Sequence, residues 1–518
     1  MNNPLGIVAA GHPDTANAAA TILAAGGNAF DAALAALFSS CVCEPVLSSL
    51  GGGGFLLAHS HNGNSVLYDF FAHTPIHKPP VKELDFHPII ADFGTAQQEF
   101  HIGMGSIAVP GTVRGIYAIH SDQCSLPLEE IIQPALQLAR EGVRINSFQH
   151  YISTIVAPII ESSPAALQLH HGKYPGVIAS ADETVKQPEM ADLFSALVQE
   201  GSDLFYRGEL AHRLVDDCKN RGGAIRLEDL KRYRVEARTP LSLNYRDTLL
   251  LTNPAPSIGG TLIAFTLSLL EQEGLYDMQH HGTRHLSNLA HAMRLTQQLR
   301  HNHKIDSDLD ADTSKRILGN SFVDSYRHTL REHASCARGT TQISITDALG
   351  NMASMTLSNG EGSGYVLPGT GIMLNNMLGE EDINPHGFHQ WLQDRRIASM
   401  MAPTLAFMPN GDRVATGSGG SNRIRSAILQ VLINLIDFSM DAAQAVEQSR
   451  IHFESDLLNL EHGIPDLSIE DLVKEFLQHR LWPEKNLFFG GAHTVMHKHD
   501  GSLIGRGDSR RGGVCIKV

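Results

Sequence analysis

Residues 340–358, TTQISITDALGNMASMTLS, predict a β-hairpin and constrain the fold more than any other stretch. The first half alternates polar and apolar residues, so its two isoleucines point to one face of a strand, and Thr340, Gln342, Ser344 and Thr346 point to the other. The segment DALGN supplies a glycine-containing turn. The second strand then returns Thr356 and Ser358 towards Thr340. Hydroxyl groups are therefore expected to gather around this one threonine.

The first hundred residues predict alternating helices and strands, and the pattern over residues 110–250 is mostly helical. Alanine-rich helices are expected over 16–25, capped by Asp14 or Thr15, and over 29–43, capped by Asn28 with Asp31 in a capping box. Such helices, apolar almost all round, are typically buried. Strands at both ends of the sequence with helices between them favour one layered α+β body over separable domains.

Two further helical and strand-forming regions complete this picture. Ser125 is expected to cap a helix over 126–141 that Pro134 kinks and a glycine ends. Beyond residue 339, segments such as 404–418 and 491–508 alternate apolar and polar residues around Asn/Gly turns, which is typical of hairpins.

Composition excludes several classes of function. The 518 residues carry a formal net charge of −15 without a basic stripe, which argues against nucleic-acid binding. The six cysteines and 28 histidines show no metal-ligand spacing, and LGGGGF lacks the spacing of a dinucleotide fingerprint, so neither metal nor cofactor is expected. The sequence also shows no secretory signal and no apolar run long enough to span a membrane. A cytoplasmic location is expected.

Thr340 could serve as a nucleophile if the chain were cut in front of it. A threonine hydroxyl needs a neighbouring base, and cleavage of the Gly339–Thr340 bond would free an α-amine on the same residue. The ordinary pKa of such an amine, about 7.7–8.0, lets it accept a proton near neutral pH. The glycine-rich segment TGSGGSNR, residues 416–423, offers consecutive N–H groups for an oxyanion, although a plain turn is the simpler interpretation.

Ordered motifs over nearly the whole chain resemble the γ-glutamyltransferase (glutathione hydrolase) proenzymes of the N-terminal nucleophile hydrolase superfamily. They include AAGGNAFDAALAAL, LGGGGF, VPGTVRG, NPAPSIGG, GTTQISITDALGN, GTGIMLNN, TGSGGS and GRGDSRRGG. The resemblance implies a four-layer αββα fold. It also implies a proenzyme that cuts itself into residues 1–339 and 340–518, which remain together as a heterodimer that could itself dimerise.

The resemblance assigns catalytic roles to particular residues. The autocleavage site falls on Gly339 and Thr340, with Thr340 as the nucleophile. The second threonine, which assists by hydrogen bonding, falls on Thr341. The hydroxyl that contacts the new amine falls on Ser358 by ungapped counting, or on Thr356.

Binding roles are implied in the same way. The oxyanion glycines fall on Gly419 and Gly420, or one residue later on Gly420 and Ser421. The acidic residue for a substrate α-amino group falls on Glu380. The serine pair that grips the substrate carboxylate appears here as Ser399 and Met400, so half of it is kept.

Three departures from the family pattern put substrate recognition in question. Gln342 replaces the usual histidine after the two threonines. The stretch 71–82 lacks the arginine that holds the α-carboxylate of a γ-glutamyl group; Lys78 or Lys82 would replace it without the bidentate fork. A long lid loop is also missing, which would open the pocket.

The sequence thus favours a self-cleaving amidohydrolase that acts on γ-glutamyl amides such as glutathione, with water or an amine as acceptor. The alternative enzyme is a related amidohydrolase for other small amides, oxamate-like or acyl. An uncleaved binding protein that keeps only the fold is a third possibility, against which the Gly-Thr-Thr sequence and the glycine loop argue.

Overall fold

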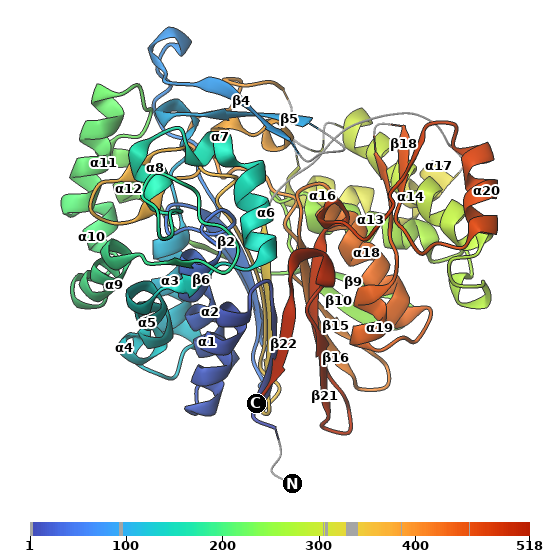
Figure 1. The fold of residues 1–518 in the computed structure, drawn as a ribbon. Helices are drawn as coiled ribbons and strands as arrows, with labels where there is room; N and C mark the ends of the chain where they lie inside the picture. Colours follow the sequence, from blue (N-terminus) through green and yellow to red (C-terminus); the bar gives the residue numbers. More distant parts are fainter. Residues whose placement is uncertain are drawn as a thin grey trace.

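Two antiparallel sheets pack face to face between two layers of helices (Figure 1). The computed structural model describes residues 4–92, 97–303, 305, 309–327, 340–384, 386–454 and 456–518. Within these residues no helix is long and apolar enough to cross a membrane. The expected α+β body with four layers, αββα, is confirmed.

The first sheet has the order β22-β1-β11-β12-β2-β3-β8. Its strands are β22 (Val514–Lys517), β1 (Gly6–Ala10), β11 (Thr341–Asp347), β12 (Met352–Ser358), β2 (Gly53–His59), β3 (Ser65–Asp69) and β8 (Glu236–Arg238). The predicted hairpin is the β11–β12 pair, and it lies between β1 and β2, two strands from the other end of the sequence.

The second sheet has the order β21-β20-β16-β15-β10-β9. Its strands are β21 (Leu503–Arg506), β20 (Gly491–His497), β16 (Arg413–Gly419), β15 (Thr404–Phe407), β10 (Thr248–Thr252) and β9 (Leu241–Tyr245). Residues before and after position 339 therefore build both sheets. The segments 1–339 and 340–518 share one core.

Helices of the N-terminal half cover the outer face of the first sheet, on the left in Figure 1. They are α1 (Pro13–Ala24), α2 (Ala29–Cys43), α3 (Thr112–Gln123), α4 (Leu128–Ile131), α5 (Gln133–Glu141), α9 (Pro188–Glu200) and α11 (Glu209–Asn220). Every residue of α2 is buried, as its apolar sequence predicts.

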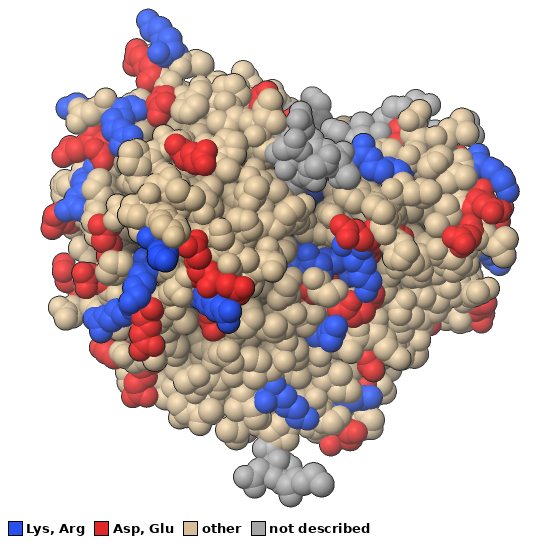
Figure 2. Space-filling view, in the orientation of Figure 1, with Lys and Arg blue, Asp and Glu red and all other residues tan. Residues whose placement is uncertain are grey.

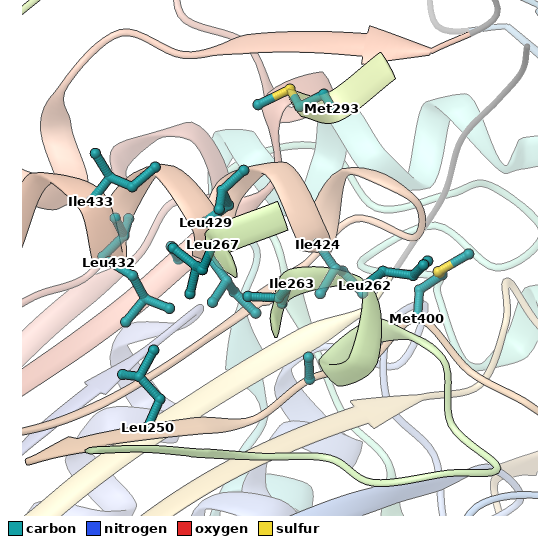
Figure 3. Packing of buried hydrophobic residues seen from close by; sticks show 14 of the residues in the cluster. Leu250, Leu262, Ile263, Leu267, Met293, Met400, Ile424, Leu429, Leu432 and Ile433 are labelled. Carbon is teal, nitrogen blue, oxygen red and sulfur yellow. The ribbon is translucent and has the colours of Figure 1, made fainter. Parts of the chain in front are cut away.

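The outer face of the second sheet is covered by α13 (Gly259–Leu270), α14 (Thr283–Asn302), α18 (Arg423–Ile436) and α19 (Ala442–Glu447). Figure 3 shows apolar side chains of three of these helices packed together, among them Leu267, Met293 and Leu432. Acidic and basic side chains intermingle on the face seen in Figure 2, in keeping with the absence of a basic stripe in the sequence.

Smaller elements lie outside these layers. They are two-stranded or three-stranded sheets formed by β4 (His87–Asp92) with β5 (Gln97–Ile102), β6 (Val143–Arg144) with β7 (Thr184–Val185), β13 (Val366–Leu367) with β14 (Ile372–Met373), and β17 (Ile451–Glu454) with β18 (Leu457–Leu460) and β19 (His479–Leu481). The remaining α-helices are α6 (Ser147–Ile155), α7 (Ala157–Ile160), α8 (Pro164–Gln168), α10 (Asp203–Tyr206), α12 (Leu227–Arg232), α16 (Ala311–Ile317), α17 (Asn320–Arg327) and α20 (Asp466–Glu475).

Two predicted helix caps differ from the structure. The side chain of His12, not of Asp14 or Thr15, caps α1 by accepting from the N–H of Asp14. The hydroxyl of Ser125 donates to Asp31 at 2.6 Å instead of capping a helix. The capping box of Asn28 and Asp31 on α2 is present as predicted.

Candidate active site

Thr340 lies at the N-terminal end of β11, level with Ser358 on β12. The register pairs Thr341 with Leu357 and Gln342 with Thr356, so the preceding residue, Thr340, stands across from Ser358. Thr340 and Ser358 are 4% and 6% exposed. The structure therefore places Ser358, and not Thr356, beside Thr340.

Gln342, at the position where the resemblance implies a histidine, lies on the same face of β11 as Thr340. Its side chain is held there by hydrogen bonds to three hydroxyl groups. Its Oε1 accepts from the hydroxyl of Thr356 at 2.6 Å, and its Nε2 donates to the hydroxyls of Ser344 and Ser354 at 3.0 Å each. A Cβ atom on Gly417 of the facing sheet would lie 2.3 Å from Gln342 Oε1. The two sheets thus meet closely here, with a fully bonded amide between them.

The predicted oxyanion loop reaches Thr340 from the second sheet. β16 ends at Gly419, and α18 begins four residues later. A Cβ on Gly419 would lie 1.9 Å from the carbonyl oxygen of Thr340, so no other residue fits there. Gly420 and Ser421 adopt φ values of 120° and 49°. Within the described part of the chain, the N–H groups of Gly420 and Ser421 have no hydrogen-bond acceptor.

This loop has the chemistry of an oxyanion hole. Its N–H groups lie at the N-terminal end of a 14-residue helix, where backbone donors and the helix dipole both favour negative charge. Ser421 uses its hydroxyl elsewhere, as a donor to Asp382. Any contribution of Ser421 to an oxyanion therefore comes from its backbone.

Thr341 points to the opposite face of β11 from Thr340. Its hydroxyl donates to Oε2 of Glu44 at 2.9 Å, and the hydroxyl of Thr15 donates to Oε1 of the same carboxyl at 2.9 Å. Burial raises the pKa of Glu44, although nearby His12 and the two hydroxyls act against the shift. The Thr341 hydroxyl is thus committed to Glu44, and its predicted assistance to Thr340 stays a prediction.

Glu380 lies beside the turn that follows Ser358. A Cβ on Gly360, whose φ is +63°, would lie 2.2 Å from Oε1 of Glu380 and 2.0 Å from Oδ1 of Asn376. The N–H of Gly360 in turn donates to the hydroxyl of Ser358 at 3.1 Å. Gly360 therefore lies between the buried carboxyl of Glu380 and the hydroxyl of Ser358, and the predicted substrate contact of Glu380 stays a prediction.

Ser399 and Met400 have local roles in the fold. The hydroxyl of Ser399 accepts from the N–H of Met401, and its carbonyl accepts from Ile258 and Gly259 at the start of α13. Met400 is 3% exposed and packs near Leu262 in the core (Figure 3). Their predicted substrate contacts stay predictions.

The two lysines considered as carboxylate ligands are exposed. Lys78 donates to the carbonyl of Trp391 at 3.2 Å and lies over its ring. Phe71, the first residue of the stretch where the arginine was expected, is 2% exposed and stacks on Phe55 at 5.5 Å. Antiparallel pairing places Phe71 beside Gly53, which pairs with Ser358. Phe71 therefore lies level with Thr340 and Ser358 in the line of residues that runs across the strands of the first sheet.

Arg511 is the site residue that sequence reasoning missed. It belongs to the motif GRGDSRRGG, which is part of the family resemblance. Of its adjacent arginines, Arg510 is fully committed to Asp508 and Glu461. Arg511 instead donates to the carbonyl of Thr340 at 3.2 Å. The two arginines are adjacent in sequence, and the structure is needed to show that only Arg511 of the pair contacts Thr340.

One group of the described residues has a geometry open to a metal ion: His12, Asp14 and Cys43. Nδ1 of His12 accepts from the Asp14 N–H at 3.1 Å. Burial raises the pKa of the Cys43 thiol well above its ordinary value, which keeps it protonated. A structural role explains the group. Gly339, the predicted autocleavage residue, lies outside the described residues.

Comparisons with known proteins identify the family of the whole chain. The family model described as gamma-glutamyltranspeptidase matches residues 15–518. The chain is 29% identical to the acylase ACY 1 proenzyme of Pseudomonas sp. (strain SE83), over 99% of this chain and 93% of that one. It is 28% identical to the glutathione hydrolase proenzyme of Escherichia coli (strain K12), over 98% and 90%.

A solved structure shows the same fold. The cephalosporin acylase from Bacillus halodurans superposes with a TM-score of 0.83 at 23% identity, covering 100% of this chain and 96% of that chain. At this identity the likeness concerns the fold alone. The resemblance inferred from the motifs is confirmed.

Proposed function

The chain belongs to the gamma-glutamyltranspeptidase family, and on that basis we propose that it is a self-cleaving amidohydrolase of the acylase type. The observation that supports this most directly is the meeting of Thr340, Ser358 and the Gly419–Gly420 loop at one point. Cleavage before Thr340 leaves a small fragment, 340–518, that starts with the nucleophile.

The proposed reaction has two halves. The Thr340 hydroxyl attacks the amide carbonyl, its proton passes to the α-amine of Thr340, and the oxyanion is held by N–H groups of Gly420 and Ser421. The amine returns the proton to the leaving nitrogen as the C–N bond breaks, which leaves an ester on Thr340 Oγ. Water then attacks that ester, again with the amine as base, and releases the acid.

For the substrate we propose amides whose acyl chain carries no α-carboxylate that must be bound. Recognition of a carboxylate favours an arginine fork. In the stretch 71–82 the lysines are exposed, and buried Phe71 stands in the nucleophile's row. Arg511 is engaged with the main chain of Thr340. An apolar or short polar acyl group fits these surroundings better than a γ-glutamyl group.

Hydrolysis of γ-glutamyl amides is the second candidate, and Glu380 favours it. A buried carboxyl close to Ser358 is the partner that a substrate ammonium needs. The relative from Escherichia coli is named a glutathione hydrolase proenzyme. The two candidates differ in what they require of the acyl chain.

Four p-nitroanilides separate the candidates. The γ-glutamyl compound carries an α-ammonium and an α-carboxylate, the glutaryl compound lacks the ammonium, the 4-aminobutanoyl compound lacks the carboxylate, and the butanoyl compound lacks both. An acylase should accept the compounds without the carboxylate within about tenfold of the γ-glutamyl compound. A γ-glutamyl enzyme should reject them by at least about 100-fold, because its buried polar groups would be left unpaired.

Processing is tested by intact mass. Purified protein should give two fragments that meet at position 340, whereas Thr340→Ala should remain one chain without activity. A wild-type chain that never cleaves would contradict the proposed function.

A further inference from the structure

Arg511 joins the nucleophile residue to the oxyanion loop. It ends the short helix η7 (Ser509–Arg511) and is 4% exposed. Its Nη1 donates to the carbonyl of Thr340 at 3.2 Å, and its Nη2 donates to the carbonyl of Leu487 at 3.4 Å. A Cβ on Gly420 would lie 3.1 Å from Nη2, so the guanidinium packs directly against the loop.

The hydrogen bond to the Thr340 carbonyl limits the distance between the Arg511 guanidinium and the α-amine that cleavage would create on Thr340. The amine nitrogen and the carbonyl oxygen of one residue are at most about 3.6 Å apart. With the hydrogen bond of 3.2 Å, the guanidinium of Arg511 therefore lies within about 7 Å of the Thr340 amine. At that distance inside a protein, like charges repel strongly.

We propose that Arg511 is a positioning residue that holds Thr340 by its carbonyl and keeps the Thr340 α-amine in its free-base form at neutral pH. The inference rests on the proposed function, because the amine exists only after cleavage. A free amine is required twice in each turnover, so its basicity sets the fraction of active enzyme.

The charge on Arg511 persists in this setting. Burial lowers the pKa of Arg511 to about 10, with Arg423 also lowering it and Asp508 and Glu361 opposing, so the group remains protonated at neutral pH. A protonated neighbour disfavours a second positive charge, and hence the ammonium form of the amine.

Other charged groups surround this end of β11, and they come from several packed elements. They are His12 after β1, Glu44 after α2, Glu361 after β12, Glu380 and Asp382 in the 377–383 turns, Arg423 on α18, His493 on β20, and Asp508 and Arg510 at η7.

Several of these groups are already bound by other partners. Asp508 contacts Arg450 at 2.7 Å and Arg510 at 3.1 Å, and Glu44 accepts from two threonines. Burial lowers the pKa of His493 to about 4, so it is neutral at pH 7. Arg511 is hydrogen-bonded to Thr340 itself, and its charge is expected to act directly on the amine.

The test compares Arg511→Gln, Arg511→Lys and the surface control Arg144→Gln, which also removes one positive charge at a 73% exposed side chain. The pH dependence of kcat/KM is measured with the p-nitroanilide that wild type cleaves best. The acidic limb of the kcat/KM profile reports the pKa of the Thr340 amine in the free enzyme. R511Q should therefore shift the midpoint of this limb to higher pH by about one unit. R511K should keep the limb in place with a lower rate, and R144Q should match wild type.

A second measurement uses wild type alone. Acetic anhydride reacts with an amine only in its unprotonated form, and fragmentation of the peptide that begins at Thr340 in the mass spectrometer gives the labelling of its α-amine against pH. Half-maximal reactivity is expected below the ordinary value of about 7.7 for an α-amine. Labelling centred at or above about 8 would overturn the inference, even if R511Q fails to mature.

The outcomes separate the two proposals. A cleaved, active R511Q whose acidic limb coincides with wild type overturns the role of Arg511 and leaves the proposed function standing. A uniform loss of rate without a shift of the limb means a purely structural role and overturns the inference as well. A wild-type chain that never cleaves contradicts the proposed function, and this inference with it.

Discussion

Thr341 and Glu44 are joined by a 2.9 Å hydrogen bond in which the threonine hydroxyl donates to a buried carboxyl at the end of α2. The neighbouring residue, Thr340, points to the opposite face, between the two sheets, where it meets Ser358 and Gly419. The two threonines at this strand end therefore face opposite ways: Thr341 makes a supporting contact, and Thr340 is the proposed nucleophile. Each can be altered without touching the other.

Glu44→Gln should change how stability depends on pH. Burial raises the pKa of Glu44 in the folded chain above its unfolded value of about 4.3, so the folded state binds the proton more tightly. Stability therefore falls as pH rises from about 4.3 through the folded pKa. Glutamine does not titrate, and E44Q should escape this fall, although it loses one threonine hydrogen bond at a cost of about 1 kcal/mol.

Urea midpoints measured across this range test the prediction. Both chains should carry Thr340→Ala, which keeps each as one polypeptide. The midpoint of E44Q relative to its parent should rise with pH. Parallel profiles would mean that Glu44 ionises equally in both states.

Ser358 and Thr356 should differ in their effect on activity. Ser358 stands beside Thr340, whereas Thr356 bonds to Gln342 at 2.6 Å. Ser358→Ala should lower self-cleavage and kcat by about tenfold or more, and Ser358→Thr should restore much of both. Thr356→Val should act mainly on stability, by about 1–3 kcal/mol, because it leaves a buried amide oxygen unsatisfied.

Rates of self-cleavage and urea midpoints of the three variants supply the comparison. The assignment would be wrong if T356V lost catalysis while S358A retained it.

Gly417→Ala should destabilise the contact between the sheets. Its Cβ would lie 2.3 Å from Oε1 and 2.4 Å from Cδ of Gln342, whose amide is held by four hydrogen bonds. We expect a loss of about 2 kcal/mol or more from overpacking. The double variant with Gln342→Ser should recover part of the loss, because the shorter side chain makes room. Equal midpoints for G417A and wild type would show that the sheets tolerate a wider spacing.

Glu380→Gln distinguishes the two substrate classes. If the carboxyl binds an ammonium, the variant should raise KM for γ-glutamyl-p-nitroanilide about tenfold or more and leave the butanoyl compound unchanged. If Glu380 only shapes the turn at Gly360, both compounds should change together. Steady-state kinetics on the two compounds decide between these outcomes.

Local patterns explain what the sequence could predict. The face of each β11 residue follows from strand alternation, and the capping box of Asn28 and Asp31 needs residues only three apart. Likewise, the glycine loop at 419–420 is recognisable because it follows an alternating strand. These features depend on short-range geometry.

Long-range partners explain what it could not predict. Thr15 resembles a helix cap, but its hydroxyl is taken by Glu44, 29 residues away. Ser125 donates its hydroxyl to Asp31, 94 residues away, and does not cap the helix that follows it. Arg511 and Arg510 are adjacent in sequence, yet only Arg511 reaches Thr340, 171 residues earlier. Such pairings depend on how the sheets stack, which no single segment encodes.

The order of strands at the edge of the first sheet would permit a circular permutant in which Thr340 is N-terminal without self-cleavage. β1 lies between β11 and the last strand, β22, and the N–H of Leu5 donates to the carbonyl of Val518 at 2.7 Å. The C-terminus lies beside the start of β1 at the bottom of Figure 1. A short linker between the two ends of the chain would allow a circular permutant whose synthesis starts at Thr340. Once its initiator methionine is removed, that permutant has the free α-amine of Thr340 without any self-cleavage.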